Sequence, residues 1–166
     1  GGCWLEQEEI RIHAKSEMCS LIASEKVQTP GHRLRHEIAG LHTDRIRLYG
    51  RAYKQIALKS EALVPFRYSV AIENSQVNDM FTEKIIDCFL TGTVPIYWGT
   101  ANLGKYFNLD GVLQFNTIEE FGSIISSISE ESYAAMMPAI VKNFELAMRY
   151  RVAEDNIFSQ YPFLIP

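Results

Sequence analysis

Residues 69–98 carry the pattern that most constrains the fold of this chain. The first part, residues 69–72, is a short apolar and partly β-branched run, typical of a strand covered on both faces. A polar stretch follows, and then an amphipathic segment with four large apolar side chains at helical spacing: Phe81, Ile85, Ile86 and Phe89. Gly92 stands where a helix C-cap glycine belongs, and residues 94–98 form a second apolar run. The pattern therefore predicts a β-α-β unit whose polar residues lie between the first strand and the helix.

Strand and helix patterns alternate along the rest of the chain as well. Further strands are predicted at residues 18–23, 45–49 and 112–115. Further helices are predicted at residues 4–15, 32–42, 101–107, 118–128 and 131–150, the last of them interrupted near Pro138. Residues 51–66 read as a connector, and residues 161–166 as an apolar tail that lies against the body. This alternation predicts an α/β fold with a Rossmann-like, doubly wound parallel sheet. The 166 residues are enough for one domain with a sizeable core.

The polar residues of the β-α-β unit lie where parallel sheets bind ligands. Ligands bind outside the carboxyl ends of the strands, and a helix start offers N–H groups and partial positive charge to a phosphate. Lys84 in the first helical turn opposes the macrodipole, at a cost of a few tenths to about 1 kcal/mol. A negative group must therefore lie nearby. Either Glu83 or a bound anion supplies it, and the anion is the sharper hypothesis.

Three short strings occur in order at a distinctive spacing. They are Ile72-Glu73-Asn74-Ser75, Thr82-Glu83-Lys84-Ile85, and Gly92-Thr93-Val94-Pro95-Ile96-Tyr97-Trp98-Gly99. Together they resemble the C-terminal, donor-binding half of the α1,3-fucosyltransferases, glycosyltransferase family 10. The resemblance implies a GT-B enzyme built from two Rossmann-like halves. Residues 1–166 would form the C-terminal half, with residues 1–16 leading in from an N-terminal acceptor domain that the chain lacks.

The resemblance also implies an activity. The chain would bind GDP-fucose as part of an inverting glycosyltransferase that moves fucose to a glycan hydroxyl. The acceptor site and the general base belong to the N-terminal half, so we expect this chain to be inactive alone. One alternative is a glycosyltransferase domain that uses another nucleotide-sugar. Another is a non-catalytic α/β interaction module, although the strand-end aspartate cluster of receiver-like modules is absent.

The family pattern assigns expected roles to nine residues. By resemblance, Lys84 contacts the diphosphate and Glu83 faces the ribose or the sugar, which makes Glu83 the catalytic candidate within this chain. Asn74 would hydrogen-bond the nucleotide-sugar, and four neighbours would line the same site: Glu73, Ser75, Met80 and Thr82. The family also has an arginine that grips the diphosphate, a role that suits the bidentate guanidinium. Arg33 and Arg35 are both candidates, and Arg35 aligns slightly better.

Two positions depart from the family pattern. Met80 stands where the family usually has tyrosine, so a phenol hydroxyl and its hydrogen bond are absent. This substitution leaves the identity of the donor open. Ile72 replaces the usual phenylalanine, which we interpret as a packing change.

Charge and composition limit the kinds of partner that the chain can be expected to bind. The net charge of −4 gives no sign of nucleic-acid binding, and no apolar run approaches the roughly 20 residues of a membrane span. The three cysteines have no metal-ligand spacing, and Cys19 and Cys88 are expected to be buried thiols. The chain lacks an Asp-x-Asp pair. If Arg35 and Lys84 neutralise the diphosphate, donor binding needs neither a metal nor another cofactor.

The expected location depends on the source of the chain. We expect a cytoplasmic protein, or one peripheral to the inner membrane, if the source is bacterial or viral. A eukaryotic member would belong to the Golgi membrane. The oligomeric state is left open by the sequence.

Overall fold

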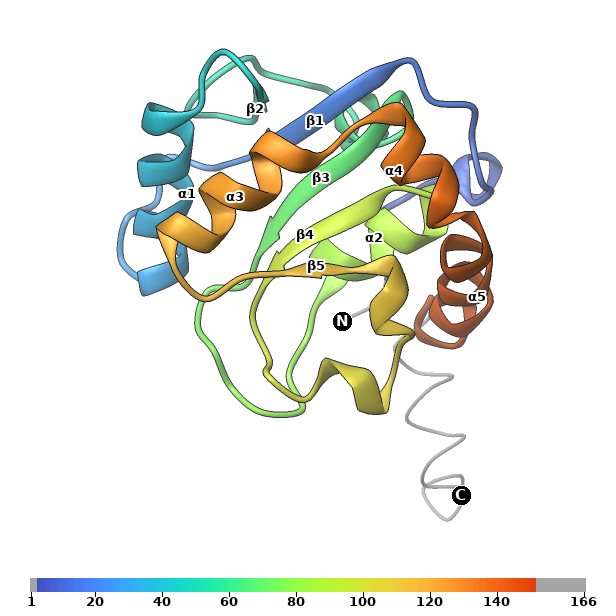
Figure 1. Cartoon of the computed structure of the whole chain (residues 1–166). Coiled ribbons are helices and arrows are strands. Elements are labelled where there is room, and N and C mark those ends of the chain that lie inside the picture. The colour runs from blue at the N-terminus through green and yellow to red at the C-terminus, as the bar shows by residue number, and fades with distance from the viewer. Residues whose placement is uncertain (1–2, 152–166) are drawn as a thin grey trace, which may run out of the picture.

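The computed structural model describes residues 3–151, which form one parallel sheet with helices on both faces (Figure 1). The five strands lie in the order β2-β1-β3-β4-β5, and every neighbouring pair is parallel. The strands are β1 (Glu17–Ile22), β2 (Arg47–Tyr49), β3 (Phe66–Ile72), β4 (Val94–Trp98) and β5 (Leu113–Gln114). The predicted α/β class with a Rossmann-like parallel sheet is confirmed.

The helices form one layer on each face of the sheet. The helices are α1 (Pro30–Leu41), α2 (Glu83–Thr91), α3 (Ile118–Ser127), α4 (Glu130–Ala135) and α5 (Met137–Ala147). In Figure 1, α1 and α3 cover the front of the sheet, whereas α2 lies behind it and packs on α5. Because α1 and α2 leave β1 and β3 toward opposite faces, the chain reverses its winding direction between these two adjacent strands. Such a reversal is a topological switch point, the usual ligand site of doubly wound sheets.

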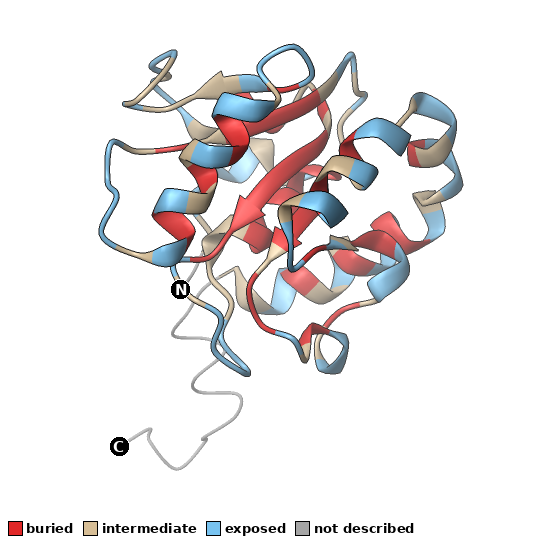
Figure 2. Cartoon of the chain, turned by 60° about the vertical axis from the view of Figure 1, so that its left-hand side comes forward, coloured by how far each residue is buried: buried red, intermediate tan, exposed pale blue. Residues whose placement is uncertain are grey.

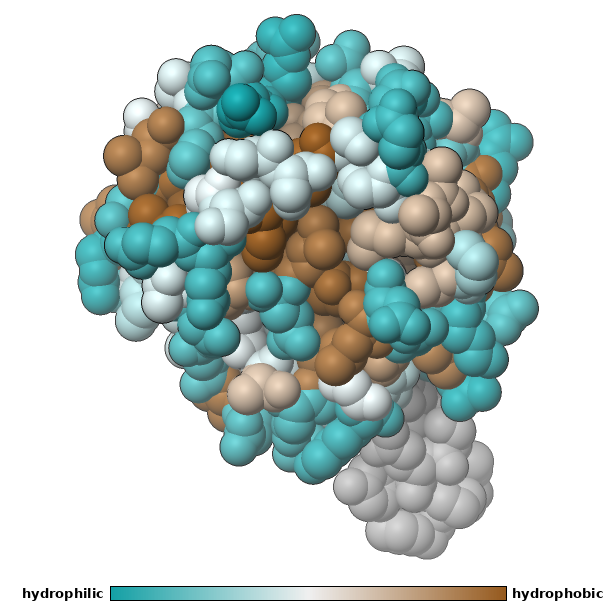
Figure 3. Space-filling view, viewed as in Figure 1, coloured by the Kyte–Doolittle hydropathy of each residue, from teal (hydrophilic) through white to brown (hydrophobic). Residues whose placement is uncertain are grey.

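The two faces of the sheet bury separate apolar cores. Alternate residues of β3 point to opposite faces, so that Val70 and Ile72 join the front core and Ala71 joins the rear core. The front core takes Ile38 from α1 and Phe121 from α3, among others. Figure 2 shows that the buried residues follow the strands and the inner sides of the helices. Figure 3 shows apolar surface between α3 and β5, on the side where partly buried side chains pack against the front core.

Several predicted boundaries need correction. The strand predicted at residues 45–49 covers only Arg47–Tyr49, and the helix predicted at residues 101–107 is reduced to the 3₁₀ turn η3 (Leu103–Lys105). The connector at residues 51–66 contains a 3₁₀ turn, η2 (Lys59–Ala62). The break predicted near Pro138 is confirmed: α4 ends at Ala135 and α5 begins at Met137. The predicted tail at residues 161–166 lies outside the described residues.

The helix predicted at residues 4–15 is wrong. This segment is extended apart from the 3₁₀ turn η1 (Gln7–Glu9). Two of its N–H groups bond to other parts of the fold: Trp4 N–H donates to Asp87 Oδ1 at 3.1 Å and His13 N–H to Thr91 O at 3.3 Å. A helix would direct backbone N–H groups to carbonyls within the segment. The contacts of the segment with the rest of the protein therefore stabilise it more than the weak apolar stripe of a helix would.

No helix among residues 3–151 has the length and apolar character that a bilayer crossing requires.

Candidate functional site

The site begins where the first turn of α1 meets the end of β3. Gly31 N–H donates to Asn74 O at 3.0 Å. A Cβ built on Gly31 would lie 1.7 Å from Glu73 O, so only glycine allows this approach. The contact fixes α1 against the carboxyl end of β3 and brings Arg35, one turn further along, to the same edge.

Arg35 lies at this edge and Arg33 does not. The guanidinium of Arg35, which is buried, donates through Nη2 to Ile72 O and to Asn74 Oδ1, the latter at 3.2 Å. Burial lowers the pKa of Arg35, while the nearby Glu73 and Glu83 carboxylates oppose this shift. Arg33 is exposed and donates to the carbonyls of the preceding loop. Of the two candidate arginines, the fold therefore brings only Arg35 to the other site residues.

Lys84 reaches the same edge from the opposite face of the sheet. Its Nζ lies 3.3 Å from Glu73 Oε2, 3.3 Å from Glu83 Oε1 and 2.9 Å from Thr82 Oγ1. Of the two groups expected to offset this lysine against its helix dipole, Glu83 lies in place, and Glu73 adds a second carboxylate. The Lys84 side chain keeps 24% of its surface exposed, so that it remains accessible to a ligand.

Glu73 holds the start of α2 in place through hydrogen bonds. Its carboxylate is fully buried and accepts hydrogen bonds from Thr82 N–H at 2.9 Å and Thr82 Oγ1 at 2.8 Å, besides the contact with Lys84. Thr82 is the N-cap of α2 and also accepts from Lys84 N–H. Glu73 and Thr82 thus use their polar groups within the protein, and they set the position of Lys84.

Glu83 is less buried than Glu73 and remains ionised. Burial raises the pKa of its carboxyl group. Lys84 and Lys59, together with hydrogen bonds, lower the pKa by more than burial raises it, so that the pKa lies below the ordinary value. Asn74 and Met80 are exposed and Ser75 is half-buried, all on the loop between β3 and α2. Three of the nine residues to which the resemblance assigns roles thus lie on this loop, at least partly exposed to solvent.

Lys59 is a neighbour of the site that the sequence did not indicate. Its Nζ lies 2.6 Å from Asp87 Oδ2 and 3.5 Å from Glu83 O. Arg35, Lys59 and Lys84 line one small cavity of about 30 Å³, together with Ile22 and Ile72 at the ends of β1 and β3. Burial raises the pKa of Asp87, and Lys59 opposes that shift. An aspartate inside the apolar stretch of α2 was the available signal, since a buried carboxylate needs a cationic partner.

The geometry thus brings three cations to the topological switch point. Arg35 arrives on α1 from the front face, and Lys84 arrives on α2 from the rear face. The cavity of about 30 Å³ has room for about one water molecule, so a phosphate would lie at its mouth, where these cations can donate charge-assisted hydrogen bonds. In the described part of the chain, no group of three or more His, Cys, Asp or Glu side chains could hold a metal ion. Cys19 and Cys88 are buried free thiols, as expected, and burial raises the pKa of Cys88 to about 12.

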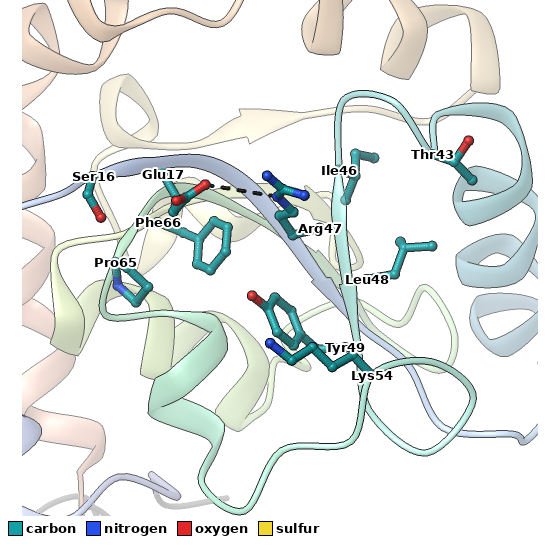
Figure 4. Close-up of a pocket in the computed structure, with 10 residues that line it drawn as sticks. All are labelled: Ser16, Glu17, Thr43, Ile46, Arg47, Leu48, Tyr49, Lys54, Pro65 and Phe66. Carbon is teal, nitrogen blue, oxygen red and sulfur yellow. Dashed lines mark ion pairs between the residues drawn. The ribbon is translucent and has the colours of Figure 1, made fainter.

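A larger cavity of about 620 Å³ lies elsewhere, beside the edge strand β2 (Figure 4). Its walls come mainly from the first residues of β1 and β3 and from β2, and include Arg47, Tyr49, Lys54 and Phe66. None of the nine predicted site residues lines it. The predicted site and this larger cavity are therefore separate places in the fold.

Solved structures of similar fold include fucosyltransferases. The chain aligns with a crystal structure of an α1,3-fucosyltransferase at a TM-score of 0.58 and 24% identity, over 75% of this chain and 38% of the other. It aligns with an α1,3-fucosyltransferase with GDP-fucose at a TM-score of 0.57 and 22% identity, over 78% and 39%. For an α1,3-fucosyltransferase with GDP the values are 0.59 and 19%, over 86% and 48%. At these identities the likeness establishes the fold.

Curated relatives share sequence with part of the chain. Alpha-(1,3)-fucosyltransferase FucT from Helicobacter pylori is 34% identical over 70 residues, which is 42% of this chain and 15% of the relative. A putative fucosyltransferase-like protein from Arabidopsis thaliana is 29% identical over 99 residues, 59% of this chain and 18% of the relative. The matched region thus spans less than a fifth of these two relatives.

A family match covers most of the chain. Residues 12–148 match the family described as Glycosyltransferase family 10 (fucosyltransferase) C-term. This range contains all five strands, the switch point and the nine predicted site residues. The chain therefore belongs to glycosyltransferase family 10, the fucosyltransferases, and corresponds to their C-terminal domain.

Proposed function

We propose that this chain is the donor-binding domain of an inverting α1,3-fucosyltransferase-like enzyme and that it binds GDP-fucose. One observation carries the proposal: Arg35 and Lys84, from helices on opposite faces of the sheet, line one cavity at the topological switch point. A diphosphate at this point would meet both cations and the first turn of α2. Family membership favours an enzyme domain over a non-catalytic α/β interaction module.

The proposed roles follow from the contacts of each side chain. Arg35 and Lys84 bind the diphosphate, and the exposed amide of Asn74 hydrogen-bonds the nucleotide-sugar. Glu83 faces the ribose or the sugar. Glu73 and Thr82 act through Lys84, because their own polar groups are already hydrogen-bonded to each other and to the lysine.

In the proposed reaction, a carboxylate of a separate N-terminal domain deprotonates the acceptor hydroxyl. The hydroxyl oxygen attacks the anomeric carbon of fucose, and the bond from that carbon to the diphosphate oxygen breaks with inversion. Negative charge develops on the departing GDP. Arg35 and Lys84 stabilise this charge from fixed positions, which is commonly a large contribution to catalysis of group transfer. The two cations make a bound metal unnecessary for holding the diphosphate.

A second candidate donor is another nucleotide-sugar. Met80 lies at the end of the loop before α2, 36% exposed, and offers no hydroxyl to a ligand. A donor that needs no hydrogen bond at this position would therefore fit as well as GDP-fucose.

Calorimetric titration tests the proposal. GDP, GDP-fucose and a UDP-sugar are titrated into the parent chain and into Lys84→Ala, Arg35→Lys and Arg33→Ala, with Lys142→Ala as an exposed lysine control. Loss of a charged hydrogen bond is expected to weaken GDP binding of Lys84→Ala by about 10- to 100-fold. Arg35→Lys should also weaken binding, since lysine lacks the guanidinium fork, while Arg33→Ala and the control should bind like the parent.

Three results would contradict parts of this proposal. Equal GDP binding by the parent and Lys84→Ala would remove the role of the lysine. UDP-sugar binding without any response to GDP would replace the donor. Weaker binding by Arg33→Ala with no effect of Arg35→Lys would exchange the two arginines.

A further inference from the structure

Asp79 has an unusual backbone conformation in the loop between β3 and α2. Its φ is 61°, and it is the only residue other than glycine with positive φ in the described range 3–151. A side chain with a Cβ rarely adopts this conformation unless surrounding contacts hold it. The loop, residues 74–82, joins Asn74 to Thr82 and carries Met80; we call it the donor loop.

Five hydrogen bonds fix Asp79, and all come from the segment after β4. The backbone N–H donates to Thr100 Oγ1 at 3.0 Å and to Asn102 Oδ1 at 2.9 Å. The carboxylate Oδ1 accepts from Tyr106 OH at 2.6 Å, from Asn102 Nδ2 at 2.8 Å and from Lys105 Nζ at 3.2 Å. The two segments meet at the bottom of the view in Figure 1, below the sheet. Asp79 therefore anchors the donor loop to a second loop.

The partners of Asp79 are themselves held by the body of the protein. Thr100 is fully buried, and its N–H donates to the hydroxyl of the buried Tyr97 at 3.3 Å. The ring of Tyr106 packs on Phe81 with centroids 5.1 Å apart. The hydrogen bond from Tyr106 and those from Asn102 and Lys105 lower the pKa of the Asp79 carboxyl, so it accepts as an anion at neutral pH. The anchor thus joins the donor loop to β4 and to the start of α2.

We propose that Asp79 is a positioning residue that pre-forms the donor loop for the nucleotide-sugar, an inference that rests on the proposed donor-binding function. The side chain of Asp79 acts through Asn74 and Met80, which lie on the same loop and face solvent. When only a fraction of molecules has the loop in its binding form, the apparent Kd is the intrinsic Kd divided by that fraction. Asp79 keeps that fraction high before the ligand arrives.

The test compares variants that separate the carboxylate from the backbone conformation. Asp79→Ala removes the carboxylate and keeps a Cβ at positive φ, whereas Asp79→Gly removes the carboxylate and adopts this φ readily. Tyr106→Phe removes one hydroxyl and keeps the ring. Asp110→Ala, an exposed aspartate on the 3₁₀ turn η4 (Leu109–Gly111), is the matched control. Amide hydrogen exchange of residues 75–82 and GDP affinity are measured for each chain.

Both Asp79 variants are expected to exchange faster at residues 75–82 than the parent. Their GDP affinity should fall about tenfold if the ordered fraction falls to about a tenth. Tyr106→Phe should give a smaller change in the same direction, and Asp110→Ala none. Because Asp79 is exposed and glycine adopts its positive φ without strain, the urea midpoint of ligand-free Asp79→Gly should stay close to that of the parent, whereas the strained alanine should lower the midpoint of Asp79→Ala.

Two outcomes overturn the inference. Parent-like exchange and affinity in Asp79→Gly would mean that the carboxylate contacts do not position the loop. A lowered urea midpoint without a local change in exchange would make Asp79 a general stabilising residue. A parent chain that fails to bind GDP contradicts the donor-binding function instead, and the exchange experiment still decides whether Asp79 holds the loop.

Discussion

Two glycines of α1 differ in what surrounds them. A Cβ on Gly31 would lie 1.7 Å from Glu73 O, a backbone atom that cannot move aside without shifting the end of β3. A Cβ on Gly40 would meet nothing within 4 Å. The same substitution at these two positions therefore tests whether the close approach of α1 to β3 holds the site together.

Gly31→Ala is expected to lower the free energy of unfolding by about 1–3 kcal/mol, because the clash forces α1 away from β3. Gly40→Ala should raise it by about 0.4–1 kcal/mol, since alanine restricts the unfolded chain and fits the helix. Urea denaturation measures both. If the two variants had equal stability, α1 would not lie against Glu73 as described.

The sequence predicts some of the residues that lie together at the candidate site, but not all of their contacts. Asn74 and Lys84 follow from the carboxyl-edge rule and from the resemblance, and both lie at that edge. The choice between Arg33 and Arg35 was also available, because Arg35 shares a helix face with Ile38, three residues on. The pairing of Lys84 with Glu73 could not be predicted. Glu73 follows the last residue of β3, where the alternation of a strand no longer fixes the direction of the side chain.

At the scale of elements, the predictable parts are those stabilised by their own pattern. The strands β3 and β4 and the helix α2 carry strong apolar patterns, and all three are confirmed. Strand β4 lies at its predicted residues, and β3 begins three residues before its predicted start. Residues 4–15 lack such a pattern, and the backbone donors at the two ends of this segment, Trp4 and His13, bond to partners far away in the sequence. Local sequence patterns cannot reveal contacts of this kind.

Lys15 fastens this N-terminal segment to the amino end of the sheet. Its Nζ lies 2.8 Å from Thr91 O, 2.9 Å from Thr93 Oγ1, 3.0 Å from Val64 O and 3.3 Å from Leu63 O. No carboxylate is among these contacts. Burial lowers the pKa of Lys15 from its ordinary value to about 7, against a smaller opposing effect of Cys88.

The stability of the chain should depend on pH through Lys15. Between pH 7 and its ordinary pKa of about 10.5, the unfolded chain holds this proton and the folded chain does not, so stability rises with pH. Below pH 7 both states are protonated, and the cost of burying the charge is fully present. Relative to Lys15→Met, the free energy of unfolding of the parent should rise by up to about 1.4 kcal/mol per pH unit.

Urea denaturation of both chains at pH 6.5, 7.5 and 8.5 measures this difference. The thiols of Cys19 and Cys88 and the tyrosines titrate in both chains, so their effects cancel in the comparison. Lys142→Met, which removes an exposed lysine, should follow the parent at every pH. A pH-independent difference between the parent and Lys15→Met would contradict the lowered pKa.

For the whole molecule, the residues of the proposed donor site gather at one edge of the sheet. The residues proposed to bind GDP-fucose all come from α1, the donor loop and the first turn of α2. The alignments span 38–48% of the solved fucosyltransferases. Donor binding is therefore proposed as a property of this chain, and transfer as a property that also needs the acceptor half.

These two properties can be separated in one set of measurements. GDP at about 100 times its Kd should raise the free energy of unfolding by about 2.7 kcal/mol, because the ligand binds only the folded state. Under the proposal that Arg35 and Lys84 neutralise the diphosphate without a metal, EDTA should leave this gain unchanged. Fucose transfer to a glycan acceptor, measured through the release of GDP, should be undetectable with the isolated chain. A gain that disappears in EDTA would place a cation in the site, and transfer by the isolated chain would require a general base among its own carboxylates, with Glu83 as the first to test.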